Sequence, residues 1–338
     1  MLLIYLVFMF IFSFTVHDTL SDVDQWFYYL AVDENIDTIM EQIIASDYDL
    51  VVIDPVITEI YSTHYDMASA IAAMHDAGKL VIAYIDIGQA EDYRTYWEPG
   101  WQIGNPTWIV GGDPDGWEGN YPVAYWYDEW QSIWFDPETG YLPLIVDLGF
   151  DGVYLDWVEA YSDENVIAFA ELDGVDPVQE MIWFIMDISE YGKSRDADFV
   201  IIAQNAAELA EFDDYVAVID AIAQEHVWFD GGATGIEGDC PLPATDDDIG
   251  TDTYIASLSL ECRQLYEDYA DSTLHVSSEE YLHYLQIAQT KGLRIFTVDY
   301  ALQPENIAWV YAESRAYGFI PFVSNRPLNQ FVPPYEGS

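Results

Sequence analysis

Residues 147–159 read DLGFDGVYLDWVE, and the fold of the chain can be worked out from this stretch. Gly149 marks the end of a helix, because glycine adopts the left-handed C-terminal conformation at little steric cost. Gly152–Asp156 is then a short apolar strand that ends on a carboxylate. Side chains alternate along a strand, so Tyr154 and Asp156 share one face. If helices cover the other face, Asp156 lies at the mouth of a parallel barrel, where strand-end carboxylates are typically catalytic. A helix-capping or loop aspartate is the simpler alternative.

The same pattern of an apolar strand followed by a helix recurs on both sides of this stretch. Strands are predicted at residues 26–31, 50–54, 80–86, 152–156, 199–205, 221–225, 294–299 and 319–324. Apolar residues at helical spacing predict helices at 36–46, 67–77, 128–135, 142–148, 177–195, 206–219, 278–291 and 304–317. Strands that alternate with helices form a parallel sheet. With 128–135 and 142–148 taken together, since they lie between the same two strands, there are eight strands and seven intervening helical segments, which fit an α/β protein with a (β/α)8 TIM barrel.

A doubly wound open sheet is the alternative architecture. Such a sheet normally carries a glycine-rich phosphate loop after its first strand, and the sequence has none. Two stretches interrupt the alternation: residues 88–127, which are dense in Gly, Pro and Trp, and residues 226–277. Loops of this length are usually functional. We therefore expect long loops after strands 3 and 6 of the barrel, on its active face.

The composition indicates a folded and strongly acidic protein. Of the 338 residues, 51% are hydrophobic and 16% aromatic, which is enough for a large core. There are 61 Asp and Glu residues against 9 Lys and Arg, a formal net charge of −52, which argues against nucleic acid as a partner. The acidic residues are spread along the whole chain, as in proteins of extreme halophiles. Molar salt shortens the Debye length to roughly 3 Å and screens the repulsion.

The first sixteen residues are apolar and uncharged. This run is short for a membrane span, which needs roughly 20 residues, and it suits the apolar core of a signal peptide. A basic leader and an Ala-x-Ala site are both missing. We expect residues 1–20 to be a signal peptide or a membrane anchor, with a buried segment as the third alternative, and residues 21–338 to be one barrel domain. The protein is expected to be a monomer, secreted or attached to a membrane through this segment.

No motif predicts a metal or a cofactor. The six histidines include no His-x-His pair, which argues against a zinc centre. Residues 113–116 and 246–250 carry fragments of a calcium loop with incomplete spacing, and solvated acidic turns are the simpler interpretation. Cys240 and Cys262 lie in the second long loop. They can form a disulfide outside the cell, and two free thiols are the alternative.

Carboxylates and amides stand at the predicted strand ends. From the second strand to the seventh they are Asp54, Asp86, Asp156, Gln204 with Asn205, Glu225 and Asp299. Five like charges held close together are costly unless a partner or a function offsets them. At least one carboxyl is therefore expected to be protonated at neutral pH, which is the condition for a general acid. Arg94, Arg326 and His226 are the candidate partners.

A protonated and an ionised carboxyl beside aromatic rings are typical of a glycoside hydrolase. Sugars stack their C–H faces on such rings, while their hydroxyls bind carboxylates and amides. The chain has 12 Trp and 26 Tyr residues. We expect core packing to take at least half of the tryptophans near the mouth. Trp126 and Trp157 are the preferred candidates for the site.

The chain resembles glycoside hydrolase family 114. The resemblance rests on YIDIGQAEDYRTYW (84–97), GFDGVYLD (149–156), QN (204–205), Glu225, DY (299–300) and GFIP (318–321), in the order of that family. It spans about residues 25–328 and implies a TIM barrel, since the family includes endo-α-1,4-polygalactosaminidases with that fold. The long acidic insertion after Glu225 departs from the family pattern. So does Asp86, which stands where a neutral residue is more usual.

The resemblance implies hydrolysis of an α-1,4-linked galactosamine-containing polysaccharide by Asp156 and Glu225. By analogy with other α-glycosidase barrels, Asp156 is expected to be the nucleophile or stabilising anion and Glu225 the acid/base. The expected substrate-binding residues are Asp54, Tyr84, Asp86, Arg94, Trp126, Trp157, Gln204, Asn205, Asp299 and Tyr300. A barrel that binds polysaccharide without cleaving it is the alternative, and it needs neither catalytic carboxylate.

Overall fold

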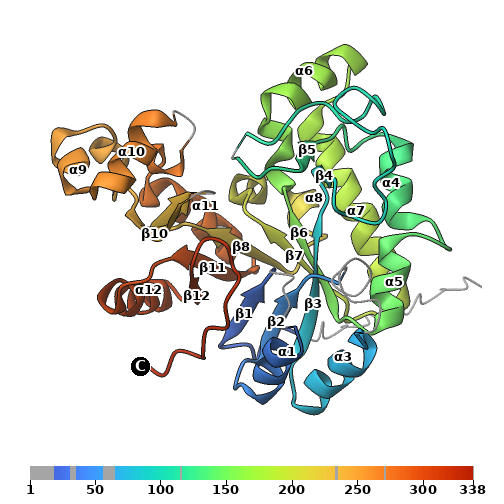
Figure 1. Cartoon of the computed structure of the whole chain (residues 1–338), viewed down its shortest axis with the longest axis horizontal. Coiled ribbons are helices and arrows are strands. Elements are labelled where there is room, and N and C mark those ends of the chain that lie inside the picture. Colours follow the sequence, from blue (N-terminus) through green and yellow to red (C-terminus); the bar gives the residue numbers. More distant parts are fainter. Residues whose placement is uncertain are drawn as a thin grey trace, which may run out of the picture.

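The computed structural model describes residues 19–30, 36–55, 65–114, 116–232, 235–269 and 272–337. Eight parallel strands form one sheet in the order β1-β2-β3-β6-β7-β8-β11-β12, and helices surround it (Figure 1). This arrangement confirms the predicted (β/α)8 TIM barrel. The strands are β1 (Trp26–Tyr29), β2 (Leu50–Ile53), β3 (Leu80–Asp86), β6 (Gly152–Asp156), β7 (Val200–Gln204), β8 (Ala221–Glu225), β11 (Arg294–Tyr300) and β12 (Ile320–Ser324).

The helices follow the barrel strands in most of the predicted places. They are α1 (Ile36–Ala45), α3 (Met67–Asp76), α4 (Asp128–Phe135), α5 (Tyr141–Leu148), α6 (Glu164–Asp173), α7 (Pro177–Arg195), α8 (Asp213–Val216), α11 (Ser278–Thr290) and α12 (Pro304–Ala316). Residues 206–219, expected to be mostly helical, contain helical segments but no single continuous helix. Ala206 is left-handed, with φ 49°, and Phe212 is extended, so the segment divides into a 3₁₀-helix at Ala207–Glu211 and the one-turn α8.

The stretch at residues 147–159 folds as predicted. Helix α5 ends at Gly149, which adopts φ 93° in the left-handed region. A Cβ at Gly152 would lie 2.2 Å from the carbonyl oxygen of Val200, so a glycine is needed where β6 meets β7. The carboxylate of Asp151 accepts the N–H of Val81 at 2.7 Å and thereby fixes the start of β6 beside β3. As a result, Asp156 lies beside Asp86 in the ladder of these two strands.

Aromatic side chains fill the seam where β12 returns to β1. The indole Nε1 of Trp26 donates to the carbonyl oxygen of Ile320 at 3.0 Å. Its ring lies 5.2 Å from the ring of Phe296 and 5.8 Å from that of Phe322, between centroids. All four side chains of β1 are buried. The barrel interior is thus packed at the seam by rings from both ends of the chain.

Both long loops contain secondary structure. The first contains the antiparallel pair β4 (Gln89–Glu91) and β5 (Asn120–Pro122). The second contains the hairpin β9 (Phe229–Gly232) and β10 (Ile236–Pro241), followed by α9 (Asp252–Ser257) and α10 (Leu260–Asp268). In Figure 1, α9 and α10 stand on one side of the barrel, and α6 with the β4–β5 segment stands on the other.

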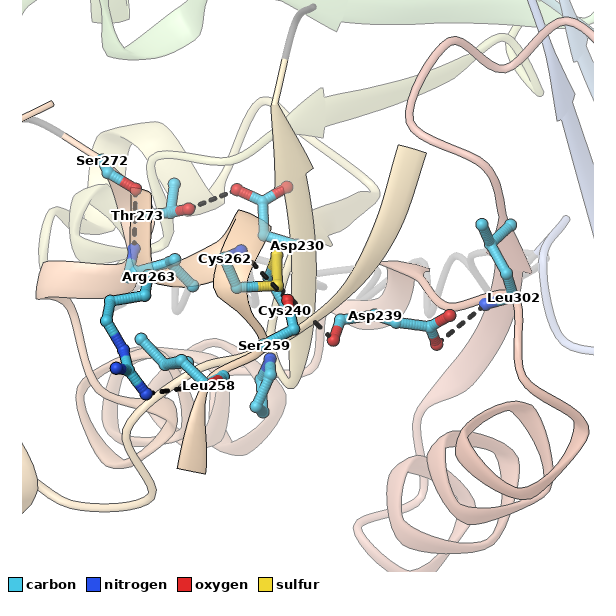
Figure 2. Close-up of a disulfide and its surroundings, with 12 residues drawn as sticks. Asp230, Asp239, Cys240, Leu258, Ser259, Cys262, Arg263, Ser272, Thr273 and Leu302 are labelled. Atoms are coloured by element: carbon cyan, nitrogen blue, oxygen red, sulfur yellow. Dashed lines mark hydrogen bonds between the residues drawn. A yellow bond between two sulfur atoms is a disulfide. The ribbon is translucent and has the colours of Figure 1, made fainter. Parts of the chain in front are cut away.

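The second loop, residues 226–277, is called the insertion below. A disulfide joins Cys240 of β10 to Cys262 of α10, so the bridged alternative is the correct one (Figure 2). Leu242, Tyr254, Leu258 and Leu274 surround the bridge and form a small core separate from that of the barrel. Asp239 attaches the insertion to the barrel, because its Oδ1 accepts the N–H of Leu302, just before α12, at 3.0 Å.

The predicted N-terminal signal peptide or anchor falls almost wholly outside the described residues, which begin at residue 19. Within the described ranges, no helix has the length and apolar character needed to cross a bilayer. The assignment of residues 1–20 therefore stays a prediction.

Candidate active site

A cavity of about 1240 Å³ lies at the carboxyl ends of the barrel strands. Asp156, Glu225, Tyr84, Trp157, Gln204 and Asn205 line it, all of them predicted site residues. The two long loops form its outer walls. Trp117 and Asn120 line it from the β4–β5 segment, and Leu265, Tyr269 and Thr273 line it from the insertion.

Asp156 is held by two hydrogen bonds at the end of β6. The hydroxyl of Tyr84 on β3 donates to its Oδ2 at 2.5 Å, and the N–H of Trp157 donates to its Oδ1 at 2.8 Å. Burial raises the pKa of Asp156 to about 7, and the negative charge of Glu225 adds to this effect. The carboxyl of Asp156 is therefore partly protonated at neutral pH.

Glu225, at the end of β8, has a different environment. Its Oε2 accepts hydrogen bonds from Gln204 Nε2 and from Asn205 Nδ2, the latter at 3.1 Å. Its Oε1 accepts the hydroxyl of Tyr300 and lies 3.6 Å from Nη1 of Arg326. Burial by itself would raise the pKa of Glu225. Arg326, His226 and these hydrogen bonds outweigh burial and lower the pKa below its ordinary value, so Glu225 is ionised.

Neighbouring strands fix the amides that bind Glu225. The hydroxyl of Tyr28 on β1 donates to Gln204 Oε1 at 3.1 Å, which turns Gln204 Nε2 toward the carboxylate. Asn205 Oδ1 accepts the N–H of Glu225 at 2.9 Å, which turns its Nδ2 the same way. Four strands, β1, β7, β8 and β11, thus set the position of one carboxylate.

Left-handed backbone conformations cluster directly after the strands that carry this pair. Trp157 follows β6 with φ 55°, Asn205 and Ala206 follow β7 with φ 56° and 49°, and His226 follows β8 with φ 43°. Each costs on the order of 1–3 kcal/mol for a residue other than glycine, and such conformations concentrate at functional sites. Close packing adds to this constraint, since a Cβ at Gly88 would lie 2.2 Å from the carbonyl oxygen of Trp157.

Asp54 and Arg94 form a buried ion-pair network behind the cavity wall. Arg94 Nη1 lies 2.8 and 2.7 Å from the two carboxylate oxygens of Asp54, and its Nε lies 2.6 Å from Oε2 of Glu91. Glu91 lines the cavity, whereas Asp54 and Arg94 do not. The structure therefore places these two predicted site residues in support of the wall.

Asp86 and Asp299 bind loop backbone. Asp86 Oδ1 accepts the N–H of Gly88 at 3.1 Å and of Gln89 at 2.7 Å. Asp299 Oδ1 accepts the N–H of Trp228 at 2.7 Å and of Phe229 at 3.0 Å. Burial raises the pKa of Asp86 well above its usual range and that of Asp299 to about 7. Asp86 and Asp299 thus have a structural role at the loops that follow their strands, and neither lines the cavity that they were expected to line.

The remaining predicted residues have separate places. Tyr300 is fully buried beneath Glu225 and acts on the site through its hydroxyl. Trp126 lies outside the cavity lining, and its Nε1 donates to Asp173 Oδ2 at 2.9 Å. Trp157 is the one of the two preferred tryptophans that the structure brings to the cavity.

Several cavity residues were not predicted as part of the site. Glu159 lies within the stretch quoted first, three residues after Asp156, and its Oε1 accepts Asn205 Nδ2 at 3.0 Å. Its buried Oε2 has no hydrogen-bond partner among the described residues, and burial raises its pKa well above the usual range. Glu208, Asp230 and Tyr281 also line the cavity. Of these, only Glu159 had a sequence signal, its spacing from Asp156.

No set of three or more His, Cys, Asp or Glu side chains within the described ranges is arranged to hold a metal ion. The residues that line the cavity are suited to acid–base chemistry. A barrel whose cavity holds one protonatable and one ionised carboxyl, amides and aromatic rings has the architecture of a glycoside hydrolase.

The comparison with known families agrees with this class. A model of glycoside-hydrolase family GH114 matches residues 18–337, and the chain belongs to this family. An uncharacterized protein of Deinococcus radiodurans is 31% identical over 287 residues, which cover 85% of this chain and 76% of the relative. An uncharacterized protein of Thermotoga maritima is 38% identical over 194 residues, which cover 56% and 55%.

Two solved structures share the fold. The glycoside hydrolase domain of PelA from Pseudomonas aeruginosa matches with a TM-score of 0.59 at 14% identity, covering 91% of this chain and 97% of that domain. The structure of Ega3 from Aspergillus fumigatus in complex with galactosamine matches with a TM-score of 0.55 at 16% identity, covering 92% and 95%. At these identities the likeness concerns the fold alone.

Proposed function

We propose that the protein hydrolyses an α-1,4-linked galactosamine-containing polysaccharide with Asp156 and Glu225 as its catalytic pair. One observation carries this proposal: two buried carboxyls line one cavity, and their pKa values are displaced in opposite directions. Such a pair supplies a proton donor and an anion at the same pH, as cleavage of a glycosidic bond requires.

The order of the two pKa values favours Asp156 as the proton donor and Glu225 as the nucleophile or stabilising anion. This assignment is the reverse of the one expected by analogy with other α-glycosidase barrels. The contacts among the described residues explain the difference: Glu225 receives three side-chain hydrogen bonds and faces a guanidinium, whereas Asp156 receives one side-chain and one backbone hydrogen bond. The anion is thus better stabilised at Glu225.

The charge of the cavity supports a cationic sugar. Besides the catalytic pair, its lining includes the carboxylates of Glu91, Glu208, Asp230 and Asp268. Arg326 is the one Lys or Arg among the lining residues that the structure describes. A deacetylated galactosamine carries an ammonium group that such a lining attracts. The galactosamine bound to Ega3, a structure of the same fold, is consistent with this substrate class.

The proposal is tested by incubating the protein in several-molar KCl with partially deacetylated α-1,4-galactosamine polymer and identifying the products by mass spectrometry. Oligosaccharides are expected from this polymer and far fewer from the fully acetylated one. If neither polymer is cleaved, the proposed activity is refuted. Retention of the intact polymer without products would favour the alternative, a barrel that binds polysaccharide without cleaving it.

We also propose that the protein works as a monomer outside the cell, or attached to its surface, in high salt. The disulfide between Cys240 and Cys262 supports an oxidising compartment. The formal net charge of −52 supports an environment rich in screening cations. A mass measurement in molar KCl tests the oligomeric state, and fractionation of the native cells tests the location.

A further inference from the structure

Arg326 lies against Glu225 from the loop that follows β12. Its Nη1 is 3.6 Å from Oε1 of Glu225 and 3.4 Å from the hydroxyl of Tyr300, which donates to the same oxygen. The guanidinium lies 4.8 Å from the centre of the Tyr300 ring. The side chain is only 17% exposed, so its charge acts on Glu225 in a poorly solvated setting.

Both long loops also meet at this guanidinium. Arg326 Nε is 3.4 Å from Oδ1 of Asp230 on the insertion. The backbone N–H of Arg326 donates to the carbonyl oxygen of Glu237, also on the insertion, at 2.8 Å. From the other side, the ring of Trp117 lies 5.5 Å from the guanidinium carbon. These contacts hold a long side chain in one direction, toward the carboxylate.

Asp230 is itself fixed by the disulfide-bonded part of the insertion. It lies opposite Cys240 in the β9–β10 hairpin, and Cys240 is bridged to Cys262. Its Oδ2 accepts the hydroxyl of Thr273, as Figure 2 shows beside the bridge. The insertion therefore reaches Glu225 through two links, from Asp230 to Arg326 and from Arg326 to the carboxylate.

Several other charged or titratable groups act on Glu225. They are His226 beside it, Tyr300 of β11, Tyr28 of β1, Tyr154 and Asp156 of β6, and Glu159 after β6. Asp156 and Glu159 favour the protonated form of Glu225 when they are ionised. His226 is cationic only when protonated, whereas an arginine keeps its charge at every relevant pH. Arg326 is therefore the contact that opposes the surrounding carboxylates over the whole working range.

We propose that Arg326 is a positioning residue that keeps Glu225 ionised and oriented, and that Asp230 on the disulfide-bonded insertion holds Arg326 in place. The inference rests on the proposed function, in which Glu225 is a catalytic carboxylate. It gives the insertion a role in the reaction besides that of a cavity wall.

The test follows the Glu225 carboxyl by ¹³C NMR in protein labelled at the glutamate side-chain carboxyl, with the signal assigned by its loss in Glu225→Gln. In Arg326→Gln the titration of Glu225 is expected to move to higher pH, and the acid limb of kcat/KM is expected to move with it. Arg326→Lys retains the charge and is expected to move the titration less. Arg315→Gln removes one cation on α12, where the guanidinium lies over Tyr311 and Tyr335, and serves as the matched control.

Below neutral pH, kcat/KM of Arg326→Gln is expected to fall on the order of tenfold to a hundredfold. An unchanged Glu225 titration in this variant would overturn the inference. The NMR readout needs no turnover, so a wild-type protein that cleaves nothing would refute the proposed function while the titration still decides the role of Arg326.

The link through Asp230 is tested by a double-mutant cycle. Asp230→Asn is expected to lower kcat severalfold in the wild-type background, because Arg326 loses the carboxylate that lies 3.4 Å from its Nε. In the Arg326→Gln background the same change is expected to have little further effect. Equal effects in both backgrounds would show that Asp230 acts independently of Arg326 and would overturn this part of the inference.

Discussion

The hydroxyl of Tyr84 donates a 2.5 Å hydrogen bond to Oδ2 of Asp156 from the neighbouring strand. This bond stabilises the ionised carboxyl and lowers its pKa, whereas burial and the charge of Glu225 raise it to about 7. Tyr84→Phe removes only the hydrogen bond that lowers the pKa of Asp156. The pKa of Asp156 is therefore expected to rise.

If Asp156 is the proton donor, activity is lost as this carboxyl ionises. The basic limb of the kcat/KM profile is then expected to move to higher pH in Tyr84→Phe. Tyr125→Phe, which removes a hydroxyl bonded to the carbonyl oxygen of Pro177, controls for the loss of a buried phenol. A movement of the acid limb would instead assign the anionic role to Asp156, as the analogy with other barrels implies.

Removal of either catalytic carboxyl separates cleavage from binding. Asp156→Asn and Glu225→Gln keep the size of the side chain and are each expected to lower kcat by about 10³-fold or more. Retention of the polymer on the protein is expected to change little, because the aromatic and amide contacts remain. Asp187→Asn, on the exposed side of α7, is the matched control. If both variants lost retention without loss of turnover, the pair would be a binding element.

The sequence predicted the barrel well because its signals are local. Gly149 and the apolar run after it determine a helix end and a strand without reference to distant residues. The direction in which a strand-end carboxylate points is not determined by the local sequence. Asp156 turns into the cavity, while Asp86, beside it in the ladder, turns toward the amides of its own loop. Strand alternation predicts the face of a side chain but not which partner its oxygens accept from.

The insertion shows a second limit of sequence patterns. Its short elements are too polar for clear periodicity, so residues 226–277 were predicted to be irregular although α9 and α10 form there. The contact between Arg326 and Asp230 joins segments far apart in the chain. No spacing in the sequence could indicate which carboxylate this arginine meets.

Salt is expected to stabilise the fold strongly. With a formal net charge of −52, repulsion acts across the whole surface at low ionic strength. The Debye length falls from about 10 Å at 0.1 M to roughly 3 Å at 1 M salt. The melting temperature is therefore expected to rise by on the order of ten degrees or more between 0.1 M and 2 M KCl. A melting temperature that does not change over this range would contradict the interpretation of the charge.

The disulfide is expected to stabilise the cavity wall formed by the insertion. Cys240 and Cys262 are 22 residues apart, and closing a loop of this length is worth about 3 kcal/mol in the chain-entropy model. The double variant Cys240→Ala, Cys262→Ala is expected to show faster proteolysis within the insertion and a higher KM for polymer, since Tyr269 and Thr273 line the cavity. Reductant should reproduce both effects in the wild type and have none in the variant. Unchanged proteolysis would show that the small core alone holds the insertion.

Asp299 is expected to make stability depend on pH. Burial raises its pKa to about 7 in the folded protein, while an unfolded aspartate titrates near its ordinary value of roughly 3.9. The folded state thus binds the proton more tightly, and the stability linked to that proton is present at low pH. It is lost as the pH rises from about 4 to about 7. Above that pH the buried ionised carboxyl costs up to about 4 kcal/mol.

Asp299→Asn removes the charge and keeps an oxygen for the N–H groups of Trp228 and Phe229. The variant is expected to unfold at a higher temperature than the wild type at pH 8 and at nearly the same temperature at pH 4, as measured by calorimetry in molar KCl. Asp247→Asn, on the exposed surface of the insertion, controls for the loss of one negative charge. A gain that is equal at both pH values would mean that the buried proton of Asp299 does not set the effect, because that proton is bound at pH 4 and lost at pH 8.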